Sequence, residues 1–244
     1  PSLFWDSIAL HDSVLLPDSL LDKGLQQAIE ADDSLHISLI YFFKGKKLHQ
    51  DFFLLRAQEC YEKARQYLPT PSPSRLQMEL DIAQADFCRF NHFASQETRL
   101  LNTALDKALQ EQDSLMLVRI GLIRSSRFKS KKEFDQALAE LRMADRYAAS
   151  VSIEKQAELQ AEMAVVHLYM EQPDSALADI ERAIATGAGR QNFYRTFCKG
   201  IRFHIARNDS AHYYFRQIAE MYPLSRKTDA YRYMSEALYH RGES

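Results

Sequence analysis

The stretch AQECYEKARQYLP, residues 57–69, decides how this chain folds, because it places Ala57, Tyr61, Ala64 and Pro69 at successive intervals of four, three and five residues. Intervals of four and three keep side chains on one stripe of an α-helix. Small residues on either side of a large one let a neighbouring helix approach closely. The stretch therefore predicts a helix that packs tightly against another helix and is followed by a proline.

The same intervals of four and three return three more times along the chain. They are carried by Ala137, Leu141 and Ala144, by Ala176, Ile180 and Ala183, and by Ala211, Phe215 and Ile218, with Pro223 restoring the closing proline. A spacing that recurs about every 35 to 45 residues is typical of helical solenoids. We therefore expect an all-α fold, a right-handed α-α superhelix of about five helix pairs with terminal capping helices.

The composition agrees with a helical protein that has a large core. The 244 residues are 46% hydrophobic and include only seven glycines and seven prolines. A formal net charge of −2 gives no global attraction to nucleic acid or to an anionic membrane. The three cysteines are far apart in sequence, so they form neither a disulfide framework nor a metal-ligand cluster. No apolar run approaches 18 residues, and we expect no membrane span.

Seven Asp-Ser dipeptides mark helix starts, because short oxygen side chains accept hydrogen bonds from the first turn of a helix. Together with prolines and glycines they predict helices over residues 19–31, 35–48, 52–67, 75–90, 94–111, 115–129, 134–149, 153–170, 175–186, 192–206, 209–221 and 227–240. We expect one domain over residues 1–244. It would consist of capping helices over 1–34, including a short one within 2–16, helix-pair repeats over 35–226 and an unpaired helix within 227–244.

These residues resemble tetratricopeptide repeats, whose helix pairs carry small and large residues at fixed positions. The best match is Tyr41, Gly45, Ala57, Tyr61, Ala64 and Pro69. The resemblance covers residues 33–244 and is weakest over 75–111, where we place the small positions at Leu101 and Ala108. The turns at 17–20 and 173–177 are similar to those of bacterial extracytoplasmic tetratricopeptide lipoproteins and sensor domains. The resemblance implies an extracytoplasmic location, periplasmic or membrane-anchored, with the cytoplasm as the alternative.

The sequence carries no motif for catalysis or cofactor binding. Its eight histidines show no metal-ligand spacing, and nucleophile-elbow, phosphate-loop and dinucleotide motifs are absent. Glu154, Glu158 and Glu162 share one helical face, where a solvated surface is favoured over an acid-base pair. We therefore predict a protein that is not an enzyme and needs no cofactor or metal.

Two stretches contain cations without acids, over residues 114–132 and 183–207. Both include first helices of repeats, which the resemblance places on the inner, concave surface where peptides bind. Aromatic side chains are interleaved in the second stretch, which suits an acidic or aromatic-containing peptide. The inner-face candidates that the resemblance indicates are Phe42, Lys46, His49, Arg119, Lys129, Tyr169, Phe203, His204, Arg232 and Tyr239.

The leading hypothesis from the sequence is a non-catalytic scaffold that binds a protein or peptide along the concave face. One alternative is a ligand-sensing or regulatory module of a larger membrane-anchored bacterial signalling protein, which the unpaired final helix would connect to an output domain. A further alternative is nucleic-acid binding through the basic first helices, although the near-neutral net charge argues against it. The sequence makes no prediction of oligomeric state.

Overall fold

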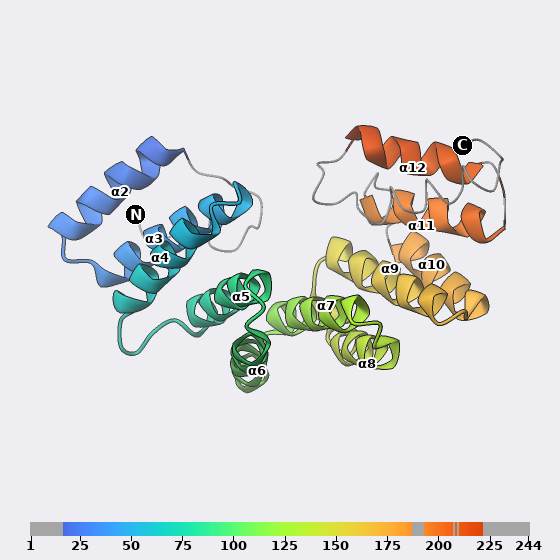
Figure 1. Cartoon of the computed structure of the whole chain (residues 1–244), viewed down its shortest axis with the longest axis horizontal. Coiled ribbons are helices and arrows are strands. Elements are labelled where there is room, and N and C mark those ends of the chain that lie inside the picture. Colours follow the sequence, from blue (N-terminus) through green and yellow to red (C-terminus); the bar gives the residue numbers. More distant parts are fainter. Residues whose placement is uncertain (1–16, 187–192, 207, 209, 222–244) are drawn as a thin grey trace. The chain divides into compact units, whose positions relative to one another are not determined.

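The computed structural model describes residues 17–186, 193–206, 208 and 210–221, and every regular element within them is a helix (Figure 1). The helices pack as consecutive pairs, as expected for an all-α helical repeat. The chain divides into two compact units, Pro1–Asp113 and Ser114–Ser244. The expectation of one continuous domain, and of an inner face that runs through all repeats, remains a prediction.

Unit 1 contains the helices α2 (Asp18–Glu30), α3 (Ser34–Gln50), α4 (Leu54–Gln66), α5 (Ser74–Phe90) and α6 (Ala94–Gln110). The helix α3 pairs with α4, α5 pairs with α6, and α2 packs on α3. Two ion pairs join α2 to α3, Asp22 to Lys44 at 2.5 Å and Asp18 to Lys47 at 2.7 Å. The core of this unit surrounds the fully buried ring of Tyr61.

Unit 2 contains α7 (Ser114–Ser130), α8 (Phe134–Asp145), the short 3-10 helix η1 (Ala148–Ser150), α9 (Ile153–Tyr169), α10 (Pro173–Thr186), α11 (Phe193–Ile205) and α12 (Ser210–Met221). The pairs are α7 with α8, α9 with α10, and α11 with α12. One core cluster lies around Leu141 and another around Ile180 and Phe215.

The helix pairs repeat along the sequence with a period close to forty residues. First helices begin at residues 34, 74, 114, 153 and 193, which are 40, 40, 39 and 40 residues apart. Second helices begin at 54, 94, 134, 173 and 210, which are 40, 40, 39 and 37 residues apart. Such regularity means that residues about forty apart occupy equivalent positions in successive pairs.

The turns inside the first four pairs are built in the same way. Phe52, His92, Lys132 and Glu171 all have positive φ, between 58° and 63°. The amide of the following residue then donates back into the last turn of the first helix, as in the bonds from Phe53 N to Leu48 O and from Phe93 N to Cys88 O, both 2.8 Å. This is the hydrogen bond of a Schellman motif, which satisfies a carbonyl at the helix end.

The predicted stripe of small and large residues does form the contact between paired helices. Ala57, Tyr61 and Ala64 are buried, and a Cβ placed on Gly45 of α3 would stand 2.4 Å from Cε1 of Tyr61. In the last pair, the same construction on Gly200 would stand 2.5 Å from Cε1 of Phe215. At these two positions only glycine lets the first helix lie against the aromatic ring.

The second pair, α5 with α6, corrects our placement of the repeat register. Leu101 lies forty residues after Tyr61 and takes the large position, while Ala104, forty residues after Ala64, takes the small one. Ala108 is buried one turn further along the helix. The sequence misled us because Glu97, a large polar residue, stands where the other second helices carry alanine.

The predicted helix over 134–149 is also shorter, since α8 ends at Asp145 and η1 follows it. Other described helix ends differ from the predictions by at most two residues. The capping helix within 2–16, Pro223 and the helix over 227–240 lie outside the described residues. Within the described ranges, no helix is both long and apolar enough to cross a bilayer.

Candidate protein-binding surface

Three of the predicted site residues lie in unit 1. Phe42 is only 2% exposed, and its ring lies 6.1 Å from the ring of Tyr61, so its side chain belongs to the core. Lys46 places its Nζ 5.6 Å from the centre of the Phe42 ring. His49 is partly buried in the last turn of α3, and burial lowers its pKa below the ordinary 6.5. Lys46 and His49 are therefore partly exposed, whereas Phe42 is part of the core.

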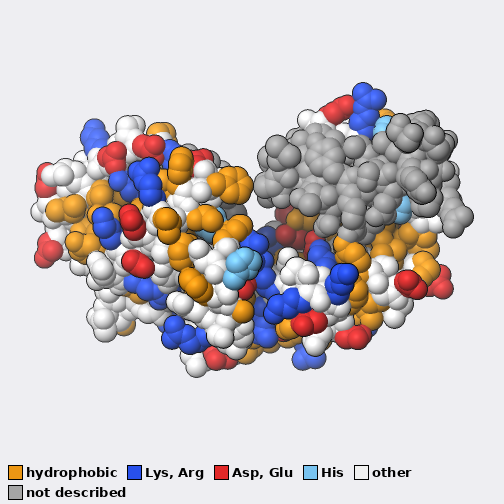
Figure 2. Space-filling view, viewed as in Figure 1, with side chains coloured by type: hydrophobic (Ala, Val, Ile, Leu, Met, Phe, Trp, Pro, Cys, Tyr) orange, Lys and Arg blue, Asp and Glu red, His pale blue; other side chains and the backbone are white. Residues whose placement is uncertain are grey.

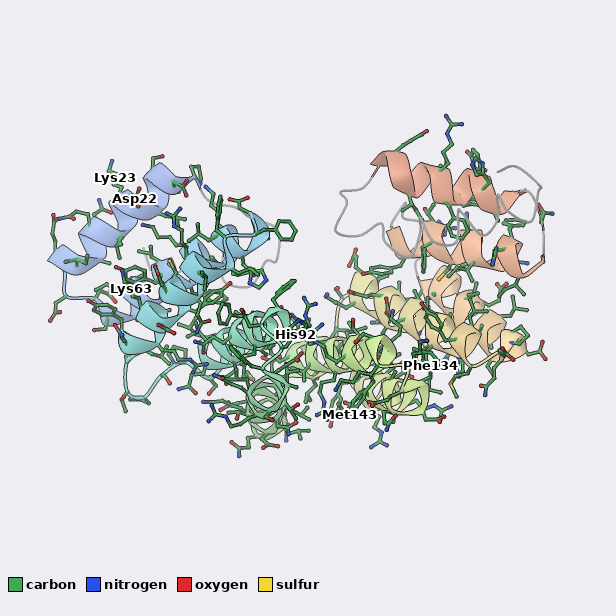
Figure 3. All side chains as sticks on the ribbon, in the orientation of Figure 1. Asp22, Lys23, Lys63, His92, Phe134 and Met143 are labelled. Carbon is green, nitrogen blue, oxygen red and sulfur yellow. The ribbon has the colours of Figure 1, made fainter. Side chains whose placement is uncertain are left out.

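Five of the predicted site residues lie in unit 2 and are all partly buried. Tyr169 stacks on Phe134, which is labelled in Figure 3, with ring centres 5.1 Å apart. Phe203 stacks in the same way on Tyr214 at 5.4 Å. The first stack joins α9 to α8 of the preceding pair, whereas the second joins α11 to its own second helix, α12. The other three are Arg119, Lys129 and His204, while Arg232 and Tyr239 lie outside the described residues.

The basic first helices of unit 2 are partly neutralised by acids from neighbouring helices. Lys129 of α7 contacts Glu162 of α9 at 2.7 Å. Arg124 of α7 contacts Glu140 of α8 at 2.8 Å. A charge count along one helix misses both acids, because each comes from a different helix. Any acidic peptide at these positions would have to compete with a carboxylate that is already in place.

Two glutamates of the acidic face of α9 form partly buried ion pairs with lysines, whereas Glu154 is exposed. Glu162 contacts Lys129, and Glu158 contacts Lys155 at 2.8 Å. His167, one turn further on, is buried and lies 2.7 Å from the carboxylate of Asp179 in α10, which also contacts Arg182. These residues hold α9 against α10. Among the described residues, no group of three potential ligands could hold a metal ion.

A second kind of surface, which the sequence did not predict, lies in unit 1 where first helices turn into second helices. Phe52 is 79% exposed, Phe53 54% and Leu55 73%, all just after α3. Phe90 and Phe93, around the end of α5, are 40% and 53% exposed. In Figure 2 hydrophobic side chains gather on the visible face of unit 1 where α3 meets α4. We call these five residues the aromatic turn surface.

The two turns that carry this surface lie side by side. The rings of His49 at the end of α3 and Phe90 at the end of α5 meet edge to face with centres 6.0 Å apart. The guanidinium of Arg89 lies 4.1 Å from the Phe90 ring, and that of Arg56 lies 5.9 Å from the Phe53 ring. His92, labelled in Figure 3, stands in the second turn. An aromatic contact therefore joins the two turns, and cations border the rings of both.

Phe52 is the most unusual residue of this surface. Its φ of 62° lies in the left-handed region, which costs a residue other than glycine about 1 kcal/mol or more. The equivalent turn residues in the next three pairs, His92, Lys132 and Glu171, are polar. A phenyl ring that is both in this conformation and mostly in water contributes little to folding. Its presence is better explained by a contact with another molecule.

The size of the surface points in the same direction. Taking about 150–250 Å² for a whole aromatic side chain, the exposed parts of the four phenylalanines amount to about 340–570 Å², to which Leu55 adds. An apolar patch of this size is comparable to the largest patch on a typical soluble monomer, and such largest patches are often functional. Phe and Arg side chains are also enriched in the centres of protein interfaces.

Comparison of the chain with protein-family models, with curated proteins and with solved structures finds no match. The likeness to tetratricopeptide repeats therefore depends on the chain's own residues and on its helix pairs, and membership of that family remains a prediction.

Proposed function

We propose that this protein is a non-catalytic helical scaffold that binds another protein chain through the aromatic turn surface of unit 1. The observation that carries the proposal is the exposure of Phe52 and Phe53 beside Phe90 and Phe93 on two adjoining turns. Resemblance to tetratricopeptide repeats supports a binding role. His49, which that resemblance assigns to the inner face, contacts Phe90 of the same surface.

The chemistry of the surface favours a protein partner over nucleic acid. Exposed phenyl rings and a leucine remove water best against apolar side chains of another protein. Bases could stack on the rings, but phosphate binding would need several cations that are not already neutralised. Arg89 lies 3.7 Å from Asp86, and Asp51 stands beside Phe52. An apolar segment with few charges, which can include the aromatic residues expected from the sequence, therefore suits this surface better than an acidic peptide.

A matched pair of leucine substitutions tests the proposal. Leu55 lies in the first turn of α4 within the surface, whereas Leu109 is 45% exposed in the last turn of α6. At 1.5 Å per residue, Leu109 lies about 24 Å along the helix from Phe93. Peptides are selected on the wild-type protein from a random peptide display library, and their affinities are measured by fluorescence anisotropy.

We expect Leu55→Ser and Phe52→Ser each to weaken the binding of the selected peptides by about tenfold or more. Leu109→Ser should leave the affinity of these peptides unchanged. Circular dichroism should show the same helix content in all variants. The proposal is rejected if no peptide is selected, or if Leu109→Ser weakens binding as much as Leu55→Ser does.

A further inference from the structure

We propose that the occupant of the aromatic turn surface is a second copy of this chain, which pairs through the same surface to form a two-fold symmetric dimer. This inference rests on the proposed function, because it names the partner of that same surface. In a two-fold interface each residue of the surface faces the same surface of the other copy. The surface must therefore be complementary to itself in area, apolarity and charge.

The apolar area fits such an interface. A stable interface buries about 800 Å² per partner, of which the central part is mostly apolar. The four exposed phenylalanines supply about 340–570 Å² of this, Leu55 adds to it, and the polar groups around them supply a rim. Phe52 projects from a turn and is the most exposed of the five, so it is the residue best placed to insert between the rings of the other copy.

The charge of the surface is the observation that favours a second copy over another protein. Arg56 and Arg89 are balanced by Asp51 and Asp86 around the same rings. Two identical surfaces with this balance approach each other without net repulsion, and each arginine can face an aspartate of the other copy. A net charge of −2 on the whole chain adds little long-range repulsion.

Sedimentation velocity of the whole chain, from about 1 µM to about 200 µM, measures the dimerisation, because this range covers the dissociation constants of weak interfaces. We expect a monomer–dimer equilibrium. Phe52→Ser should raise the dissociation constant by about 100-fold or more, since each substitution removes the contact twice per dimer. Leu109→Ser should not change it.

Charge-reversal variants separate self-pairing from a general loss of structure. Arg56→Glu makes the surface negative and Asp51→Lys makes it positive, and each change alone should weaken the dimer by about tenfold because like surfaces then repel. An equimolar mixture of the two variants should form mixed dimers with wild-type affinity or better, and the double variant should behave as wild type does.

Several outcomes would overturn the dimer, and they differ from those that reject the proposed function. The chain could stay monomeric over the whole concentration range while Leu55→Ser still weakens the binding of selected peptides. That result would assign the surface to a different protein. A dimer that Phe52→Ser leaves intact would use another surface. Growth beyond the dimer would exclude a closed two-fold pairing, and a mixture of the two charge variants that stays monomeric would exclude self-complementary charge.

Discussion

Gly45 of α3 lies directly against the ring of Tyr61 in α4, so closely that a single added carbon would stand 2.4 Å from Cε1 of that ring. Tyr61 is the large residue of the stripe that reveals the repeat, and it is 1% exposed. Its ring cannot move away without breaking the contact between the two helices. The close approach of α3 and α4 therefore depends on the glycine as much as on the tyrosine.

Gly45→Ala should destabilise the protein by about 1–3 kcal/mol, measured by chemical denaturation, because the new methyl group overpacks the contact. The sign is informative, since the same substitution at an ordinary helix position stabilises by about 0.5–1 kcal/mol. The double variant with Tyr61→Leu should lose less than the sum of the two single losses. Strict additivity, or stabilisation by Gly45→Ala, would show that the two residues do not meet.

A second prediction concerns the buried carboxylate of Asp81, which contacts Arg65 of α4. Burial raises the pKa of Asp81 above 3.8, while the hydrogen bond and charge of Arg65 act to lower it. Arg65→Met leaves the carboxylate buried without its cation, and we expect a loss of about 3 kcal/mol near neutral pH. Arg65→Lys keeps the charge, so its loss of unfolding free energy should be smaller.

The pH dependence of the Arg65→Met variant follows from the raised pKa of Asp81. Between 3.8 and the folded-state pKa the folded chain binds more protons than the unfolded chain, so stability falls as the pH rises through this interval. Removing Arg65 extends the interval upward. The difference in unfolding free energy between variant and wild type should therefore shrink as the pH falls to about 4, where protonation of Asp81 relieves the cost. An equal difference in unfolding free energy near neutral pH and at about pH 4 would contradict this account.

The ion pairs between α2 and α3 should matter much less. Asp18 and Asp22 have side chains that are 72% and 66% exposed, so solvent screens their attraction to Lys47 and Lys44. We expect Asp22→Asn to lower the unfolding free energy by less than about 1 kcal/mol, and the loss to disappear in about 1 M salt. Denaturation at low and high salt measures both. A loss that persists in high salt would indicate a role beyond charge.

His49 provides a local probe of the aromatic turn surface. Burial lowers its pKa below 6.5, with Arg89 adding to the effect and Asp86 opposing it. The folded state therefore disfavours protonation, and the contribution of His49 to stability falls as the pH drops from 6.5 toward its folded-state pKa. Phe90→Ala should raise this pKa toward 6.5 by letting water reach the imidazole. Nuclear magnetic resonance titration of the ring protons would show the change, and an unmoved pKa would mean that Phe90 does not shield His49.

The sequence predicted the helix pairs well because their contacts are local and periodic. The packing of paired helices follows directly from the small and large residues Ala57, Tyr61 and Ala64. Residues about forty positions further along the chain repeat the same pattern. The register of α6 was harder to read, because Glu97 stands where the stripe carries alanine elsewhere. A stripe of small and large residues shows which side of a helix faces its partner. A single polar residue within the stripe is enough to make it hard to recognise.

The binding surface could not be predicted as well, because exposure and charge depend on contacts between helices. The cationic stretch of α7 looked unopposed, yet Glu140 and Glu162 neutralise part of it from α8 and α9. Phe42 looked accessible from its family position and is buried. The exposed ring of Phe52 could have been noticed once the forty-residue register was known, since Lys132 and Glu171 stand at the equivalent turns.

The most direct test of the central claim is site-specific photo-cross-linking from the aromatic turn surface. A photoreactive phenylalanine analogue replaces Phe53 in one variant and Tyr213, a 59% exposed residue of α12, in another. We predict that the analogue at Phe53 cross-links to the selected peptide or to a second copy of the chain, while the analogue at Tyr213 gives no product. Equal cross-linking at both positions, or none from Phe53, would contradict a binding role for this surface.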